Sequence, residues 1–284
     1  MRKARLLAAC ALLAAACAGP ARRPSSTVQR ELPLSAEARG GGGTFDLRYS
    51  AGDEGEIAAL RSAILVAAAP LSRWGSFEQP VDIRVYPDHE SLEAAVQRDG
   101  YPWLRAWAFG DRIFLQSPRS WNDPSPAAVS AELLELLAHE LTHSLMYQLL
   151  GGAPEPPLWF REGMASVTAG QGHRRPTSDE LSRWIAAHPH EDLLEPTPEV
   201  YRTEKEAVYG AAHRAFELFL AMAGDDGVRE LLLLARGGAT FEDAFSTVTG
   251  VSVARFEKDA VQARFSRASF ARKQGAGGDV KERW

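Results

Sequence analysis

Residues 133–150 read LLELLAHELTHSLMYQLL and carry two histidines, His139 and His143, four positions apart. Residues four apart lie one above the other on an α-helix, so both imidazoles can reach one metal ion. A second set of positions at helical spacing is apolar: Leu134, Leu137, Leu141 and Leu145. A helix that is apolar over most of its surface is buried, and two histidines in a buried helix need polar partners. The stretch therefore predicts a buried helix with one metal-binding face.

Glu140 follows His139 directly and lies beside the two histidines on the predicted helix. A carboxylate in that position can hold the water of a bound metal without being a ligand itself. The alternative interpretation is a pair of core histidines that are satisfied by hydrogen bonds. A third ligand elsewhere in the chain decides between the two.

A catalytic zinc takes three protein ligands and keeps one position for water. The candidates that follow His143 are Glu155, Glu162 and His173. Glu155 lies among prolines in a loop, and His173 lies in polar, loop-like sequence. Glu162 falls in the first turn of the helix expected over 158–169, which a proline-rich loop brings back against the first helix. Glu162 is therefore the preferred third ligand; its alternative role is a helix-start carboxylate favoured by the helix dipole.

The segment around Glu162 reads WFREGMA over residues 159–165 and completes the pattern HExxH…WxxEGxA. With this pattern the chain resembles the gluzincin zinc metallopeptidases, in particular the peptidase MA-like family. The resemblance covers about residues 44–265. It implies a short α/β layer, an active-site helix, a helix with the ligand glutamate and then a helical bundle.

The resemblance implies a zinc ion bound by His139, His143 and Glu162, with Glu140 as the general base. The chain departs from the family pattern at one place. Many gluzincins carry an aspartate four residues after the ligand glutamate, which orients a ligand histidine, whereas this chain has Ser166 there. The ligand histidine must therefore be oriented by another group.

Peptide hydrolysis also needs a donor for the oxyanion besides the metal. Tyr209 and His213 lie four apart in the helix expected over 204–223 and could offer it from one face; the alternative for both is ordinary packing. The strand expected near residues 109–115 could bind a peptide substrate by β-addition, or it could simply close the sheet.

The pattern of the whole chain predicts an α+β fold. A small N-terminal α/β layer is expected over residues 44–125, followed by a mainly helical zincin catalytic region over 126–268. Alternating apolar residues predict strands, and helical periodicity and capping signals predict helices. Strands are expected at 45–49 and 81–85, and a hairpin or a paired strand at 108–116. The expected helices lie at 55–74, 88–98, 127–150, 158–169, 177–188, 204–223, 226–236, 240–249 and 253–266. Residues 269–284 are expected to be a disordered tail.

The first 16 residues combine basic side chains with an apolar segment, which is typical of a signal peptide. Cleavage before Cys17, with lipid attached to that cysteine, would make the protein a lipoprotein anchored in the bacterial cell envelope. The alternatives are an ordinary secretory signal cut after Ala18, and a lipobox at Cys10 that leaves almost no apolar segment. Residues 17–43 are rich in Pro, Ser, Ala and Gly, and predict a flexible tether.

Composition excludes several classes of function. Cys10 and Cys17 are the only cysteines, so the mature domain has no thiolate for catalysis or zinc ligation. The net charge is −5 and becomes −8 when the three basic residues of the signal peptide are removed. An acidic domain without basic clusters is a poor nucleic-acid binder, so the expected partner is a peptide or protein substrate.

Three functions remain open at this point. The main hypothesis is a zinc endopeptidase of the cell envelope. The second is a catalytically inactive zinc-binding lipoprotein that acts as an envelope adaptor, against which Glu140 argues, because a structural zinc site needs no general base. The third is an aminopeptidase, which ranks low because no Gly-x-Met-Glu-Asn segment precedes His139.

Overall fold

The computed structural model describes residues 32, 34–98, 100–121 and 126–258, which belong to one compact unit. The predicted signal peptide, with Cys10 and Cys17, and the predicted tail lie outside the described residues.

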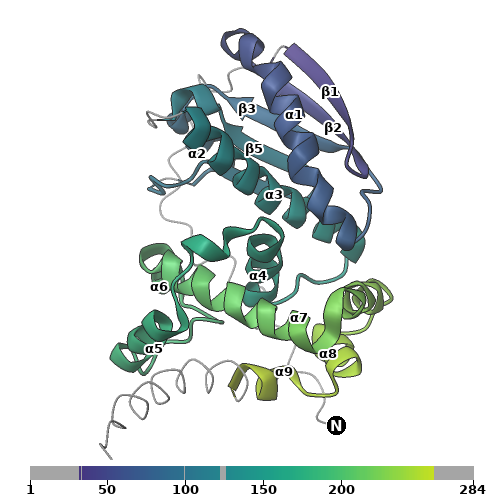
Figure 1. Cartoon of the computed structure of the whole chain (residues 1–284), viewed down its shortest axis with the longest axis vertical. Coiled ribbons are helices and arrows are strands. Elements are labelled where there is room, and N and C mark those ends of the chain that lie inside the picture. Colours follow the sequence, from purple (N-terminus) through teal and green to yellow (C-terminus); the bar gives the residue numbers. More distant parts are fainter. Residues whose placement is uncertain (1–31, 33, 99, 122–125, 259–284) are drawn as a thin grey trace, which may run out of the picture. The chain divides into compact units, whose positions relative to one another are not determined.

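A five-stranded mixed sheet forms the first part of the fold, with the strand order β1-β2-β3-β5-β4 (Figure 1). Its strands are β1 (Leu34–Gly40), β2 (Gly43–Tyr49), β3 (Val81–Tyr86), β4 (Ala106–Phe109) and β5 (Arg112–Gln116). β2, β3 and β5 are parallel to one another, whereas β1 and β4 pair antiparallel with β2 and β5. The three predicted strand regions are confirmed, and β4 lies at one edge of this sheet.

The predicted tether over residues 17–43 is wrong from Leu34 onward. β1 and β2 form a hairpin in which Leu34 pairs with Tyr49. Gly41 and Gly42 have φ values of 57° and 83°, as a tight hairpin turn requires, so the glycine run is a turn and not a linker. The composition of this segment did not indicate a strand, because β1 buries only one side chain, that of Ala38, and so shows no apolar alternation.

Helices cover both faces of the sheet. α1 (Ile57–Ala68) and α3 (Pro126–Leu150) pack together in the main core on one face, and α2 (His89–Val96) lies on the other face in a smaller core. α2 begins as predicted, because Asp88 accepts a hydrogen bond from the backbone N–H of Ser91 at 2.8 Å. α3 confirms the long helix predicted over residues 127–150.

Among the described residues, one helical stretch, Ala51–Arg73, is long and apolar enough to cross a membrane by length and composition. The core helix of a globular domain passes the same test. Ile57, Leu60 and Ile64 of this stretch are buried in the main core against the sheet and α3. In this structure the stretch therefore serves as a core helix.

The rest of the described chain is helical, as predicted. Its helices are α4 (Leu158–Thr168), α5 (Ser178–Ala187), α6 (Pro198–Thr203), α7 (Lys205–Arg236), α8 (Phe241–Thr249) and α9 (Val253–Arg255). The helices predicted over 204–223 and 226–236 are one helix, α7, which is interrupted at Gly224 by a non-helical conformation with φ 67° and ψ −178°. α6 was not predicted, since six residues are too few for a periodic pattern.

One hydrophobic core joins the sheet to the helical part, across the boundary expected between residues 125 and 126. Trp74, which follows α1, donates a hydrogen bond from Nε1 to Thr168 Oγ1 of α4 at 2.8 Å. The same indole packs edge-on against Phe216 of α7, with ring centroids 6.0 Å apart. These contacts hold α4 between the sheet layer and α7, and so determine where the side chains of α4 point.

Candidate metal centre

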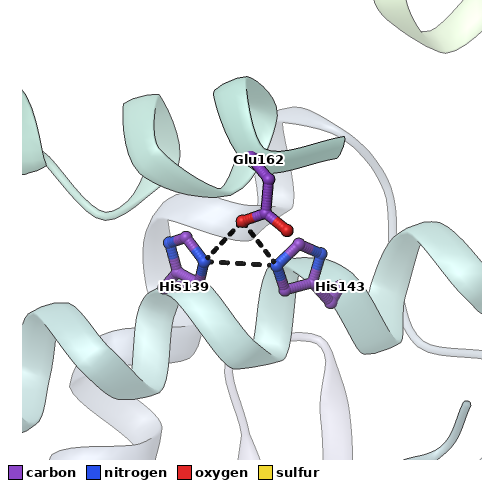
Figure 2. Close-up of side chains that lie close together, drawn as sticks. All are labelled: His139, His143 and Glu162. Atoms are coloured by element: carbon purple, nitrogen blue, oxygen red, sulfur yellow. Dashed lines mark hydrogen bonds and ion pairs between the residues drawn. The ribbon is translucent and has the colours of Figure 1, made fainter. Parts of the chain in front are cut away.

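The structure brings the three predicted metal ligands together (Figure 2). His139 and His143 project from α3, and their Nε2 atoms are 3.2 Å apart. Glu162 projects from α4 toward both histidines, and its Oε2 lies 3.3 Å from the Nε2 of His139 and 3.6 Å from that of His143. The helix spacing read from the sequence thus produces a cluster of three ligand atoms.

Close packing of α4 against α7 positions Glu162. A Cβ atom on Gly163 would lie 2.4 Å from the backbone oxygen of Ala212 and 2.5 Å from Cβ of Phe216. Both contacts are too short for any side chain, so glycine is required where the two helices meet. Trp159 and Phe160, one turn earlier, are fully buried in an aromatic cluster with residues of α7 and α8. The WxxEGxA segment therefore anchors α4 with its glutamate directed at α3.

The spacing of the three atoms suits a tetrahedral zinc ion. Two ligands that are each about 2.0–2.1 Å from such an ion lie roughly 3.3–3.4 Å from one another. The observed separations of 3.2, 3.3 and 3.6 Å bracket that value. Oε2 of Glu162 is buried and has no hydrogen-bond partner among the described residues, which leaves it available to a cation. The residues present therefore fit a zinc site.

The charges of the three side chains also favour a bound cation. Burial alone would raise the pKa of Glu162, but the adjacent His143 and His139 outweigh it and hold the pKa well below its usual range. For His143, burial would lower the pKa, yet Glu162 beside it raises the pKa above its usual value. The buried carboxylate thus draws positive charge onto its neighbours, a demand that a divalent cation would meet.

Other candidates for the third ligand lie elsewhere. The side chain of Glu155 is 70% exposed and pairs with Arg161 at 2.8 Å. His173 is also exposed and lies 3.6 Å from Glu135. Within the described part of the chain, His139, His143 and Glu162 are the group of side chains that could hold a metal ion.

Glu140 lies between the ligand cluster and the edge strand. Its side chain is buried, and burial raises its pKa above the usual value. The backbone N–H of Ala108 in β4 faces its carboxylate and lowers the pKa again, by less than burial raises it. The carboxylate is thereby placed beside the strand edge, while its role as a general base stays a prediction.

Tyr209 lies near the cluster, with its ring centroid 6.2 Å from that of His139. Its hydroxyl oxygen is 3.0 Å from that of Tyr201 in α6, a residue that the sequence pattern did not single out. Burial raises the pKa of both tyrosines, so both hydroxyls remain neutral hydrogen-bond donors. Since α6 was not predicted, no spacing rule could have found Tyr201.

His213 lies in α7 one turn after Tyr209, and its ring nitrogens are directed away from the ligand cluster. Nδ1 is 2.9 Å from Ser166 Oγ, and Nε2 is 3.4 Å from a carboxylate oxygen of Glu217. Burial lowers the pKa of this histidine, which favours the neutral ring. The structure thus brings Tyr209, and not His213, into contact with the ligand side chains; the catalytic roles of both stay predictions.

A further contact was not anticipated from the sequence. Gln171, in the loop after α4, places Oε1 3.2 Å from Nδ1 of His139. The serine at position 166 had indicated that some other group must orient a ligand histidine. No sequence signal identified which residue it was.

Comparisons with known proteins show the fold. No known family profile matches the chain, and no curated protein sequence matches it. The structure is similar to aminopeptidase A of Legionella pneumophila, solved in complex with aspartic acid, with a TM-score of 0.51 and 11% identity over 78% of this chain. It is also similar, with a TM-score of 0.36 and 15% identity over 88% of the chain, to the M1 zinc metallopeptidase of Deinococcus radiodurans.

The chain spans 27% of the length of the first neighbour and 52% of the second. At 11% identity the likeness to the aminopeptidase shows the fold alone. The chain therefore has an α+β fold, with a small mixed sheet followed by helices, that is shared with part of that aminopeptidase.

Proposed function

We propose that this chain is a zinc-dependent peptidase that hydrolyses peptide bonds. The observation that supports the proposal most strongly is the convergence of His139, His143 and Glu162 at tetrahedral spacing, with Glu140 next to them. A structural zinc site usually has four protein ligands and needs no adjacent base. Three ligands and a neighbouring carboxylate are the parts of a hydrolytic site, which also argues against the inactive adaptor.

In this proposal His139, His143 and Glu162 would hold the zinc ion. When bound, zinc would supply a Lewis acid that polarises the scissile carbonyl group and acidifies water. Glu140 takes a proton from the attacking water and delivers it to the leaving amine. Tyr209, a neutral donor near His139, provides a hydrogen bond to the developing oxyanion, and Tyr201 orients its hydroxyl group.

The substrate would lie along β4. This strand pairs with β5 on one side only, so its other edge offers backbone groups to an extended peptide. Because the backbone N–H of Ala108 in this strand faces the carboxylate of Glu140, the strand adjoins the residue proposed as the general base. A peptide that extends β4 would therefore pass close to the ligand cluster.

We further propose an endopeptidase. The four residues of β4, Ala106–Phe109, include no acidic side chain that could bind a free amino terminus next to Glu140. Glu135, one turn before His139, is already paired with Arg174 at 3.0 Å. The structural neighbour from Legionella pneumophila is named as an aminopeptidase, which leaves an exopeptidase as the competing possibility.

For localisation, the basic and apolar start of the chain supports export, and Cys17 supports lipid anchoring in the cell envelope. A lipid on that cysteine would keep the peptidase at a membrane surface. Without it the protein would be periplasmic or secreted.

The metal assignment predicts about one zinc ion per chain in the wild type and loss of zinc in Glu162→Gln. The variant keeps the shape of the side chain but removes the negative charge that favours a cation. Metal analysis after gel filtration measures the zinc content per chain of the wild type and of the variant. Glu155→Gln, which changes an exposed carboxylate of the neighbouring loop, is the matched control. Loss of zinc in the control, with full occupancy in Glu162→Gln, contradicts the assignment.

The catalytic assignment predicts that Glu140→Gln binds zinc and unfolds at a temperature close to that of the wild type. Peptide hydrolysis should fall by about 10²–10⁴-fold, because the amide cannot accept the proton of water. Glu132→Gln, two turns earlier on α3, is the control and should retain activity. Equal rates for Glu140→Gln and the wild type would assign the activity to another base or to a contaminant.

The endopeptidase assignment predicts that one peptide is cleaved at the same internal bond whether its amino terminus is free or acetylated. Rates for the two forms should agree within a few-fold, because no charged group of the site recognises the amine. Mass spectrometry of the products identifies the bond. Cleavage of the free form alone, with release of single residues, would establish an aminopeptidase.

The anchoring assignment predicts that Cys17 carries lipid. Palmitate supplied to expressing cells should label the wild type and not Cys17→Ala, whereas Cys10→Ala should be labelled like the wild type. If the wild type takes up no label, or if Cys17→Ala is labelled equally, the protein is not a lipoprotein of this kind.

A further inference from the structure

A ligand histidine can bind a metal through Nε2 only when that nitrogen carries a lone pair, which requires the proton to be on Nδ1. In His139, Nε2 faces Glu162 and His143 (Figure 2). Its other ring nitrogen, Nδ1, faces Gln171. The position of the ring proton of His139 therefore depends on whether Gln171 offers Nδ1 a hydrogen-bond acceptor or a donor. The side-chain amide can offer either, because its oxygen and nitrogen exchange places on a half-turn.

Arg175 settles that choice. Its Nη2 contacts the same atom of Gln171 that contacts His139. Arginine has donors only, so the shared atom must be the amide oxygen. An oxygen 3.2 Å from Nδ1 accepts a hydrogen bond from the Nδ1–H group, so the proton of the neutral ring lies on Nδ1 and the lone pair on Nε2.

The same guanidinium also contacts Ser166, whose hydroxyl group faces a second histidine, His213. Nε of Arg175 donates to Ser166 Oγ at 3.0 Å, so the single proton of this buried hydroxyl is free to point at Nδ1 of His213, 2.9 Å away. The carboxylate of Glu217, 3.4 Å from Nε2 of His213, can only accept, which favours the ring proton on Nε2 and leaves Nδ1 to accept from Ser166. The contacts thus favour opposite tautomers for His139 and His213, with Gln171 facing the first ring and Glu217 the second.

Arg175 is itself held rigidly. Its side chain is only 10% exposed and lies 3.7 Å from Glu206. Its guanidinium carbon lies 5.2 Å from the ring centroid of Tyr209. Gly172, next to Gln171, has room for no side chain, because a Cβ atom there would lie 2.9 Å from Nε2 of His213. The loop that carries Gln171 is therefore closely packed against α7.

We propose that Gln171 and Arg175 are positioning residues that set the tautomer of His139 for metal binding, in the place that other gluzincins give to an aspartate on α4. The inference rests on the proposed zinc site. Arg175 orients the amide, the amide orients the imidazole, and Ser166 accepts a hydrogen bond from Nε of Arg175. The serine at this position is therefore part of an alternative arrangement and not a lost function.

The test compares Gln171→Met, which removes the acceptor at similar volume, with Gln171→Glu, which keeps it. Zinc affinity, measured by competition with a chelator, should weaken about 10–100-fold in Gln171→Met and stay within a few-fold of the wild type in Gln171→Glu. Arg175→Met should resemble Gln171→Met. Arg174→Met, in which a neighbouring arginine loses its contact with Glu135, should not change the affinity. Thermal unfolding checks that each variant folds.

A second readout needs no metal. Long-range ¹⁵N–¹H spectra of the metal-free protein at a pH where His139 is neutral should show its proton on Nδ1 in the wild type and in Gln171→Glu. In Gln171→Met and Arg175→Met the two tautomers should mix. An unchanged tautomer together with unchanged zinc affinity in Gln171→Met would overturn the inference, as would equal losses of affinity in Gln171→Met and Arg174→Met. Absence of zinc from the wild type would refute the proposed function instead, and the tautomer measurement would still stand.

Discussion

The arrangement of this protein depends on the contact between α4 and the backbone of α7 at Gly163. Because a Cβ atom there would lie 2.4 Å from the Ala212 oxygen, the two helices approach more closely than a residue with a side chain at this position would allow. This closeness fixes the depth of α4 in the core, and so the distance between Glu162 and the histidines of α3. With α4 in this position, the three ligand atoms converge within 3.6 Å of one another.

The ligand cluster places several polar groups in the apolar interior of the protein. Burying a carboxylate and imidazoles is costly unless each polar atom has a partner. Here the outer nitrogen of His139 is satisfied by Gln171, and Glu140 receives the N–H of Ala108. Oε2 of Glu162 is the atom of the cluster left for a cation. The aromatic packing around Trp159 stabilises α4 and so helps to offset the free energy of burying the carboxylate of Glu162.

A separate set of hydrogen bonds relates the edge strand to the ligand helix. Gln148, at the C-terminal end of α3, accepts hydrogen bonds from the backbone N–H groups of Glu78 and Gln79. Its amide nitrogen donates to Asp111, in the turn between β4 and β5, at 2.7 Å. One buried side chain, five positions after His143, thus joins the turn that ends β4 to the helix with the ligands. The position of β4 relative to Glu140 is therefore constrained at two points, at Ala108 and at the turn that contains Asp111.

The sequence by itself determined the features that depend on neighbours along the chain. A spacing of four places His139 and His143 on one face, because the helix repeat is a property of the backbone, and alternating apolar residues predicted strands for the same reason. Glu162 was identified from its local pattern, and the structure brings it to the histidines. The glycine run before Thr44 has the composition of a tether but forms a turn. A turn and a linker have the same composition, and only the pairing of the flanking strands distinguishes them. Tyr201, Gln171 and Arg175 come from segments with no periodic pattern, and their contacts with Tyr209, His139 and Ser166 arise only when α4, α6 and α7 pack together. Those partners were decided by the tertiary structure, because hydrogen bonds between distant segments depend on the path of the connecting loops, which no local spacing records.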